Sequence, residues 1–226
     1  MSDKLIELSP LFDPNAGECP PASAIEFYLE TPTTLGLLHT LATQKGMTDY
    51  TSAIMQAWDA GAAAFLRVLT SFVELECSPI TRLPSGARVG LYQLPDQLFV
   101  TRVPHVIAGG TEIARFHDHI YVGATGVHDG AHWPVDFDGL RAQIDGPAAV
   151  AEGELVRTLT ASIGTEWSID PQPATGFREL IGPALAAYVE DYPRHDCPGD
   201  FEPASAQRWT IAEMRGRPRS RRYRSA

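Results

Sequence analysis

The chain has 226 residues, of which 44% are hydrophobic and 20% charged, a composition that suits one main globular domain and excludes a low-complexity protein. The opening residues MSDKLIELSP lack a basic start and an apolar run, and no stretch is long and apolar enough to span a bilayer, so we expect a soluble, cytoplasmic protein without membrane contact. Three cysteines, none in a C-x-x-C arrangement, argue against a disulfide framework and against a cysteine-based zinc site.

The N-terminal third predicts an extended segment followed by helices. Residues 1–30 are interrupted by prolines and form an extended lead-in that ends in a short helix or strand near AIEFYLE. Thr31 followed by Pro32 is typical of a helix start, and Gly46 can end that helix in a left-handed conformation.

The clearest element is a long helix that starts at Thr48 and reaches about Glu76. Its apolar side chains recur at spacings of three and four, which predicts one continuous stripe facing the core. Small residues around Gly61 allow a neighbouring helix or sheet to approach closely. The stripe consists of Ile54, Trp58, Gly61, Phe65, Val68 and Phe72.

The hydrophobic period changes to two from Ala87 onward. ARVGLYQL and QLFVTRV flank a turn at Pro95-Asp96, and HVIA and TEIARF flank a hairpin turn at Gly109-Gly110. This pattern predicts a central antiparallel β-meander of four or five strands that ends near Val127.

Helical periodicity returns after Pro134, in LRAQI, in the segment from Pro147 to Gly164, and in GFRELIGPALAAYVEDY. N-terminal helices, then an antiparallel sheet, then C-terminal helices indicate the α+β fold class. The predicted organisation is a lead-in over 1–30, a single α+β domain over 31–206 and a disordered, arginine-rich tail over 207–226.

Histidines are concentrated in FHDHIYVGATGVHDGAHW, residues 116–133, which holds four of the seven in the chain. On a strand over residues 111–122, His117 and His119 share one face, about 7 Å apart along the strand, and form half of a metal site. The strand divides into a polar face with Arg115, His117, His119 and Tyr121 and an apolar face with Ala114, Phe116, Ile120 and Val122.

The second half of such a site would come from the loop that follows, through His128 or His132, with Asp129 as a possible general base. Three nitrogens and one water suit zinc, whereas two histidines and a carboxylate suit iron or manganese. The alternative is a solvated strand face and a glycine-rich loop that bind no metal.

The C-terminal end is strongly basic. Residues 208–226 contain seven arginines and one acidic residue, which leaves 11 basic and 27 acidic residues in the rest of the chain. Arginine binds phosphate in pairs of hydrogen bonds, and tyrosine can stack on bases, so the tail is a candidate for RNA or DNA binding or for an acidic partner surface. The residues concerned are Arg215, Arg217, Arg219, Arg221, Arg222, Tyr223 and Arg224.

Two functions from different classes follow. The leading hypothesis is a non-enzymatic subunit of a larger assembly, such as a phage, mobile-element or ribonucleoprotein particle, with an acidic body that docks to other protein subunits, a tail that binds nucleic acid, and no cofactor. The alternative is a metal-dependent hydrolase or lyase that uses the histidines between 117 and 132. The familiar nucleotide-binding, hydrolase and zincin motifs are absent from the sequence.

Overall fold

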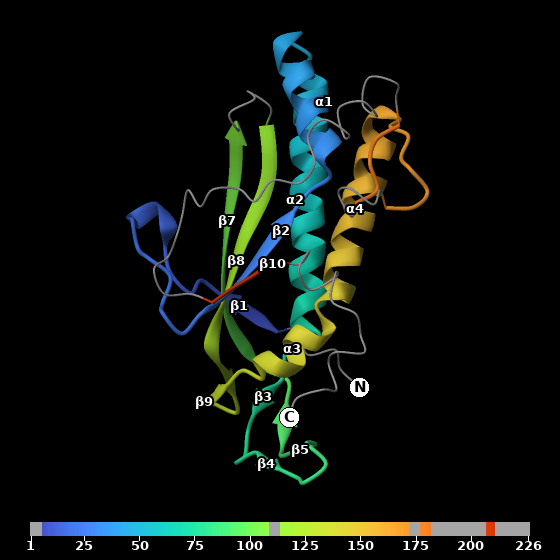
Figure 1. Ribbon diagram of the computed structural model, residues 1–226. Coiled ribbons are helices and arrows are strands. Elements are labelled where there is room, and N and C mark those ends of the chain that lie inside the picture. The colour runs from blue at the N-terminus through green and yellow to red at the C-terminus, as the bar shows by residue number, and fades with distance from the viewer. Residues whose placement is uncertain (1–5, 109–113, 172–176, 182–206, 211–226) are drawn as a thin grey trace.

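The computed structural model describes residues 6–108, 114–171, 177–181 and 207–210. Its centre is a mixed sheet in the order β1-β7-β8-β2-β10, with β9 paired to β8 (Figure 1). The strands of this sheet are β1 (Glu7–Ser9), β2 (Ile25–Glu30), β7 (Gln97–Ala108), β8 (Ala114–His128), β9 (Ala131–Pro134) and β10 (Gln207–Thr210).

Four α-helices occur in the described part of the chain: α1 (Thr33–Gln44), α2 (Thr48–Thr70), α3 (Phe137–Gln143) and α4 (Asp145–Ile163). A short 3-10 helix, η1 (Pro14–Ala16), precedes β2. Two small ribbons complete the described elements, β3 (Leu75–Glu76) with β6 (Tyr92–Gln93), and β4 (Thr81–Arg82) with β5 (Arg88–Val89).

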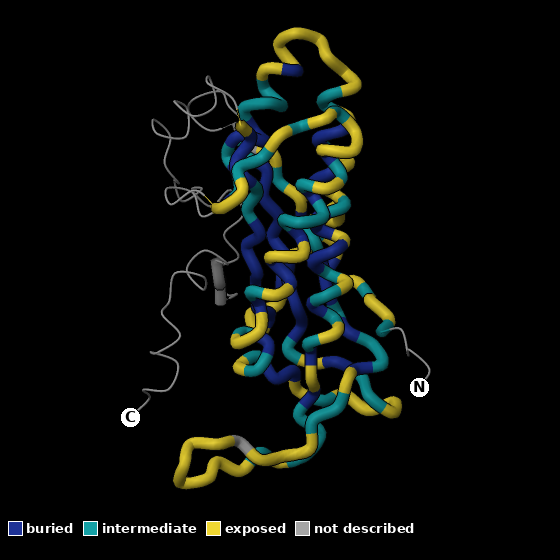
Figure 2. The backbone as a smooth tube through the Cα atoms, turned by 90° about the vertical axis from the view of Figure 1, so that its right-hand side faces the viewer, coloured by how far each residue is buried: buried dark blue, intermediate teal, exposed yellow. Residues whose placement is uncertain are grey.

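Helices α2 and α4 lie side by side along one face of the sheet (Figure 1). The apolar stripe of α2 faces the sheet as predicted, since the rings of Phe27 and Phe65 lie 6.3 Å apart. The helix ends at Thr70 rather than near Glu76, because Leu75 and Glu76 form the strand β3. A Cβ atom on Gly61 would be 3.0 Å from the carbonyl oxygen of Ala151 on α4. The absence of a side chain at Gly61 therefore allows the two helices to pack closely, and the buried core follows their contact with the sheet (Figure 2).

The sheet is mixed, so the prediction of an antiparallel meander is not confirmed. β7 and β8 do form a long antiparallel hairpin, but β1 pairs with β7 and β10 pairs with β2 in parallel. The predicted order of helices and strands also differs, because β1 and β2 precede α1 and β10 follows α4. Parallel partners come from distant parts of the chain, which local periodicity does not reveal.

Both segments that the sequence sets apart from the domain contribute strands to the sheet. Residues 25–30, at the end of the predicted lead-in, form the inner strand β2, and residues 207–210, at the start of the predicted tail, form β10. The arginines from Arg215 to Arg224 and the third predicted C-terminal helix beyond residue 181 lie outside the described residues. Residues 177–181 themselves are not helical, and Leu180 forms a β-bridge with Trp167.

The second face of the sheet is covered in part by the segment after β1. Thr101 fixes this segment, because its hydroxyl accepts hydrogen bonds from the backbone N–H groups of Leu11 and Phe12. Phe12 then packs edge-on against Tyr121 at a centroid distance of 5.3 Å. In the described ranges, none of the helices combines the length and apolar character needed to cross a bilayer.

Candidate metal centre

Three histidines meet on the sheet face opposite α2 and α4. His105 on β7 is the cross-strand partner of His117 on β8, and His119 is two residues further along the same strand. The ring centroids are 5.4 Å apart for His105 and His117, 4.7 Å for His105 and His119, and 5.0 Å for His117 and His119. The backbone pairing of one hairpin therefore brings three imidazoles into one cluster.

The geometry of this cluster fits a metal ion. One ring nitrogen from each histidine lies within 4.8 Å of the other two. Three imidazoles on a tetrahedral ion, each at 2.0–2.1 Å, have nitrogens about 3.3 Å apart, so the nitrogens would approach one another by up to about 1.5 Å when an ion binds. His117 and His119 are each only 2% exposed, which excludes the solvated strand face considered above.

Glu26 on β2 orients one of these imidazoles. Its Oε1 lies 2.5 Å from Nδ1 of His119, and both side chains are buried. A carboxylate bound to one ring nitrogen fixes the tautomer and leaves Nε2 available as a ligand. The ring of Tyr28, two residues along β2, packs against His117 at 4.9 Å and His119 at 5.3 Å.

Asp118, between the two histidines on β8, points to the opposite face and anchors the strand to α2. The indole N–H of Trp58 donates to Oδ2 of Asp118 at 2.8 Å, and Nε of Arg102 donates to Oδ1 at 2.5 Å. Burial raises the pKa of Asp118 to about 6, although Arg102 and Trp58 stabilise the carboxylate.

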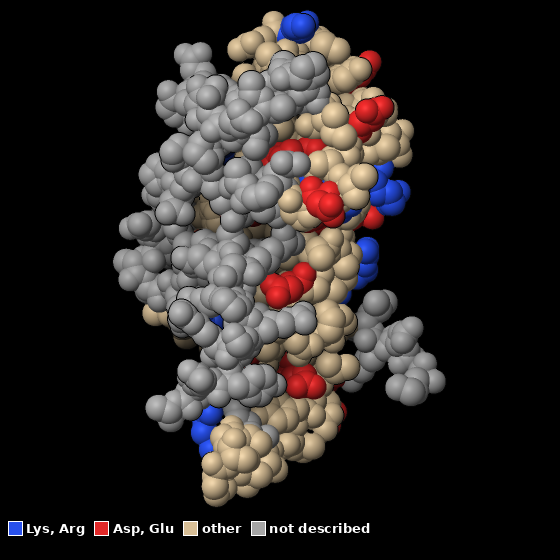
Figure 3. All heavy atoms as spheres, turned by 45° about the vertical axis from the view of Figure 1, so that its right-hand side comes forward, with Lys and Arg blue, Asp and Glu red and all other residues tan. Residues whose placement is uncertain are grey.

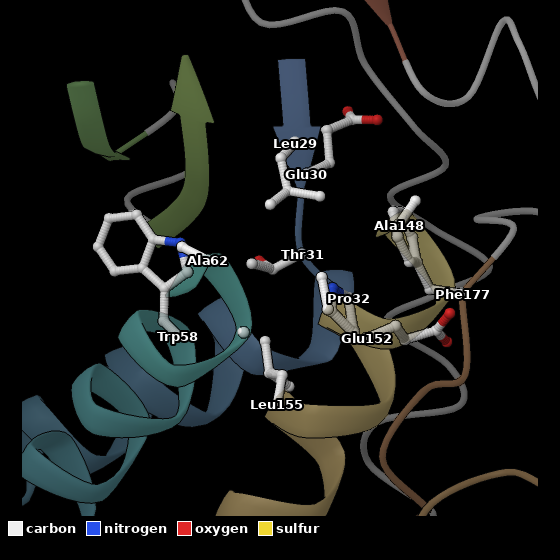
Figure 4. Close-up of a pocket in the computed structure, with 12 residues that line it drawn as sticks. Leu29, Glu30, Thr31, Pro32, Trp58, Ala62, Ala148, Glu152, Leu155 and Phe177 are labelled. Atoms are coloured by element: carbon white, nitrogen blue, oxygen red, sulfur yellow. The ribbon is translucent and has the colours of Figure 1, made fainter. Parts of the chain in front are cut away.

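A pocket of about 440 Å³ opens next to the cluster and includes His117. The polar groups in its lining include Arg115, Tyr28 and Glu30. A second pocket of similar size, between α2, α4 and the end of β2, is mostly apolar (Figure 4). The two pockets share Glu30, Thr31, Pro32 and Phe177, so they adjoin at the end of β2.

The other histidines of the predicted site lie elsewhere. His128 is nine residues beyond His119 on β8, about 30 Å along the strand, and Asp129 follows it in the turn to β9. His132 on β9 stacks on Phe99 with ring centroids 6.1 Å apart. The structure thus brings His117 and His119 together, as predicted. It places His128, His132 and Asp129, which were predicted to complete the site, away from them.

Asp96, His128 and Asp129 form a separate group, with ligand atoms within 4.8 Å of one another. Nδ1 of His128 is 3.0 Å from the carbonyl oxygen of Leu94, and the backbone N–H of Asp129 donates to Asp96 at 2.9 Å. Asp129 and Gly130 both have positive φ, which is typical of a type I′ hairpin turn. The structure of the β8–β9 turn accounts for this group.

Two members of the cluster were not predicted from the sequence. Glu26 was detectable as an acidic residue between the apolar residues Ile25 and Phe27 of the strand IEFYLE, because carboxylates are rarely buried without a partner. Whether His105 joins the cluster depended on the register of the β7–β8 hairpin. A two-residue turn at Gly109-Gly110 would pair His105 with Ala114, whereas the observed register pairs it with His117.

Comparisons with known proteins indicate the fold. No family model matches the chain, and no curated protein matches it. Among solved structures, the metal-free complex of the conjugative relaxase TrwC with OriT DNA matches with a TM-score of 0.53 and 14% identity, over 72% of this chain and 52% of the relaxase chain. A metal-bound complex of TrwC with OriT DNA matches with a TM-score of 0.51 and 15% identity, over the same shares of the two chains.

A third match is TrwC with a 27-mer DNA that comprises the recognition hairpin and the cleavage site. Its TM-score is 0.51 and its identity 14%, over 83% of this chain and 62% of the relaxase chain. These matches contradict the leading hypothesis of a non-enzymatic assembly subunit, because the similar structures are those of a relaxase bound to DNA. They give no support to RNA or protein subunits as partners. The chain spans about half the length of the first relaxase structures that it matches, and it shares their fold.

Proposed function

We propose that this chain is a metal-dependent enzyme domain that binds DNA and breaks its phosphodiester backbone. The observation that carries the proposal is the convergence of His105, His117 and His119 on one buried sheet face. This is the metal-dependent hydrolase named as the alternative above, with His105 in place of His128 or His132 as the third ligand. The likeness to a DNA-bound relaxase supports DNA as the substrate.

The residues present suit a divalent first-row metal. His105, His117 and His119 supply three neutral nitrogen donors, which is a common ligand set for zinc and leaves a coordination position for substrate. Glu26 orients His119 in the way that carboxylates orient metal-bound imidazoles. The cation would act as a Lewis acid that polarises a phosphate oxygen.

Arg115 would bind a phosphate group of the DNA. It lines the same pocket as His117, and its guanidinium can form two parallel hydrogen bonds to phosphate oxygens. The chain as a whole carries a formal charge of −10, so DNA binding depends on such local positive groups. A base next to a phosphate bound at His117 would have the adjoining apolar pocket within reach.

The proposal is tested with the full chain, purified without a histidine tag, and an end-labelled single-stranded oligonucleotide. We expect cleavage when Zn²⁺ or Mn²⁺ is added, none with a chelator, and recovery when the ion is restored. His117→Ala should abolish cleavage, whereas His132→Ala, which changes a residue on β9 stacked on Phe99, should retain it. The proposal would be overturned if, with either ion, the chain neither cleaved the oligonucleotide nor bound DNA in a metal-dependent way.

A further inference from the structure

Residues 177–181 form a short strap at the end of β2, where two pockets adjoin. These are the phosphate pocket, with Arg115 and His117 in its lining, and the apolar pocket between α2 and α4. Phe177 lines both pockets and is 6% exposed. In Figure 4, Phe177 and Trp58 lie on opposite sides of the apolar pocket. The strap therefore brings an aromatic side chain to the junction of the two pockets.

Hydrogen bonds on two sides hold the strap. The backbone N–H of Arg178 donates to Oε1 of Glu152 on α4 at 2.9 Å. The backbone N–H of Ile181 donates to the carbonyl oxygen of Glu166 at 3.0 Å. Because both ends of the strap are bonded to other parts of the chain, Phe177 has a fixed position between the pockets.

Glu179 ties the strap to the first turn of α1. Its carboxylate accepts hydrogen bonds from the backbone N–H groups of Thr33 at 3.1 Å and Thr34 at 2.9 Å, and from the hydroxyl of Thr34 at 2.6 Å. Pro32, at the N-cap position, has no side-chain hydrogen bond to these groups, so Glu179 caps the helix instead. The strap and the start of α1, whose Thr33 lines the phosphate pocket, are therefore held together.

The apolar pocket has room for a planar ring. Its volume of about 440 Å³ lies within the range of small-ligand sites. Small residues on the two facing helices leave this space open. They are Gly61 and Ala62 on α2, and Ala148 and Ala151 on α4. A nucleic-acid base can enter such a pocket and stack on an aromatic side chain, and Phe177 supplies one.

The distribution of charge indicates which part of DNA enters the apolar pocket. Arg115 lines the phosphate pocket, whereas the charged residues that line the apolar pocket are the carboxylates Glu30 and Glu152. Carboxylates are also spread over the helical face that Figure 3 shows. This side of the molecule repels a phosphate backbone but not an uncharged base. Carboxylates only accept hydrogen bonds, so they suit the amino group of cytosine, adenine or guanine, which thymine lacks.

We propose that the apolar pocket takes up one base of the DNA strand, that Phe177 stacks on this base, and that Glu179 is a positioning residue that holds Phe177. The base belongs to a nucleotide next to the phosphate bound at Arg115 and His117, because the two pockets adjoin. The inference rests on the proposed function for the identity of the strand, and it adds a residue that determines which nucleotide is accepted there.

The test measures the affinity of the zinc-loaded full chain for a single-stranded phosphorothioate oligonucleotide, which resists cleavage, and for a set in which one nucleotide at a time lacks its base. We expect removal of the base at one position near the cleavage point to lower the affinity of the wild type about tenfold. Phe177→Leu should lower the affinity for the intact strand by a similar factor. In this variant, removal of the same base should cause no further loss.

Three further comparisons use the same strands. Phe177→Tyr, which keeps an aromatic ring, should bind the intact strand like the wild type. Glu179→Gln should weaken binding of the intact strand but not of the strand without that base, a difference that a merely structural role would not produce. Phe99→Leu is the matched control, because the ring of Phe99 stacks on His132, away from both pockets, and its loss should leave the affinity unchanged.

Metal content and cleavage of an ordinary oligonucleotide are measured on the same chains, and all variants should keep the bound ion. The inference fails, and the proposed function stands, if the wild type cleaves DNA but no base removal lowers its affinity. It also fails if base removal costs the wild type and Phe177→Leu the same at every position. A wild type that neither binds nor cleaves the strand overturns both proposals. Equal affinity for thymine and cytosine at the identified position would overturn selection by the carboxylates.

Discussion

Oε1 of Glu26 lies 2.5 Å from Nδ1 of His119, and both side chains are buried within the sheet. Glu26 belongs to β2 and His119 to β8, so this contact exists only because the two strands pair in antiparallel register. The register also places Tyr28 directly opposite His119. The candidate metal centre is therefore assembled by three strands rather than by one local motif.

Substitution of Glu26 should weaken metal binding. Glu26→Gln keeps the size of the side chain but removes the negative charge that makes the imidazole of His119 a stronger metal ligand. We expect affinity for Zn²⁺ to fall 10–100-fold in competition with a chromophoric chelator. Glu154→Gln, which removes a carboxylate paired with Arg157 on the surface of α4, serves as the control. Wild-type affinity in Glu26→Gln would mean that Glu26 does not support a bound ion.

Substitution of Arg115 should weaken DNA binding without removing the ion. Arg115→Ala eliminates a guanidinium from the pocket that contains His117. We expect lower affinity for single-stranded DNA and a salt dependence shallower by about 0.7, as for loss of one phosphate contact on a single strand. Arg157→Ala, on the surface of α4, should leave the affinity for DNA and its salt dependence unchanged. An unaltered salt slope in Arg115→Ala would exclude a direct contact with phosphate.

Stability should depend on pH through Asp118. Its pKa is raised from 3.8 to about 6 in the folded chain, mainly by burial. Between pH 3.8 and about 6 the folded state therefore keeps a proton that the unfolded state loses. The contribution of Asp118 to the free energy of unfolding falls as the pH rises through this range and is constant above it. Relative to Asp118→Asn, the wild-type free energy of unfolding should fall by up to about 3 kcal/mol between about pH 4 and 6.

Urea denaturation of the wild type and Asp118→Asn at a series of pH values measures this difference. Asparagine can still accept the hydrogen bond from Trp58 but carries no charge to pair with Arg102. The prediction therefore concerns how the difference in stability changes with pH and not its size at one pH. A difference in stability that stays constant or grows as the pH rises from 4 to 6 would show that Asp118 is ionised throughout the range.

Some of this architecture could be predicted from local patterns. The spacing of Ile54, Trp58 and Phe65 predicted the long helix α2, and strand alternation predicted that His117 and His119 share a face. Asp118, on the other face, was not singled out. Its carboxylate is tolerated among apolar residues because Trp58 and Arg102 both donate to it.

Pairing between distant segments could not be predicted in the same way. β1 and β10 join the sheet in parallel from opposite ends of the sequence, and no periodicity reports such partners. Pro104 is tolerated within β7 because β1 pairs only with residues 97–99, and no described strand pairs with β7 on that side at Pro104. His105 follows this proline and joins the site only through the hairpin register.

The most direct test of the central claim is the metal content of the untagged full chain after loading with Zn²⁺ or Mn²⁺ and removal of excess ion. We predict about one ion per chain, close to none in His105→Ala or His117→Ala, and an unchanged content in the double variant His128→Ala/His132→Ala. No bound ion in the wild type, or an ion that survives the loss of His105 and disappears with His128 and His132, would contradict the account.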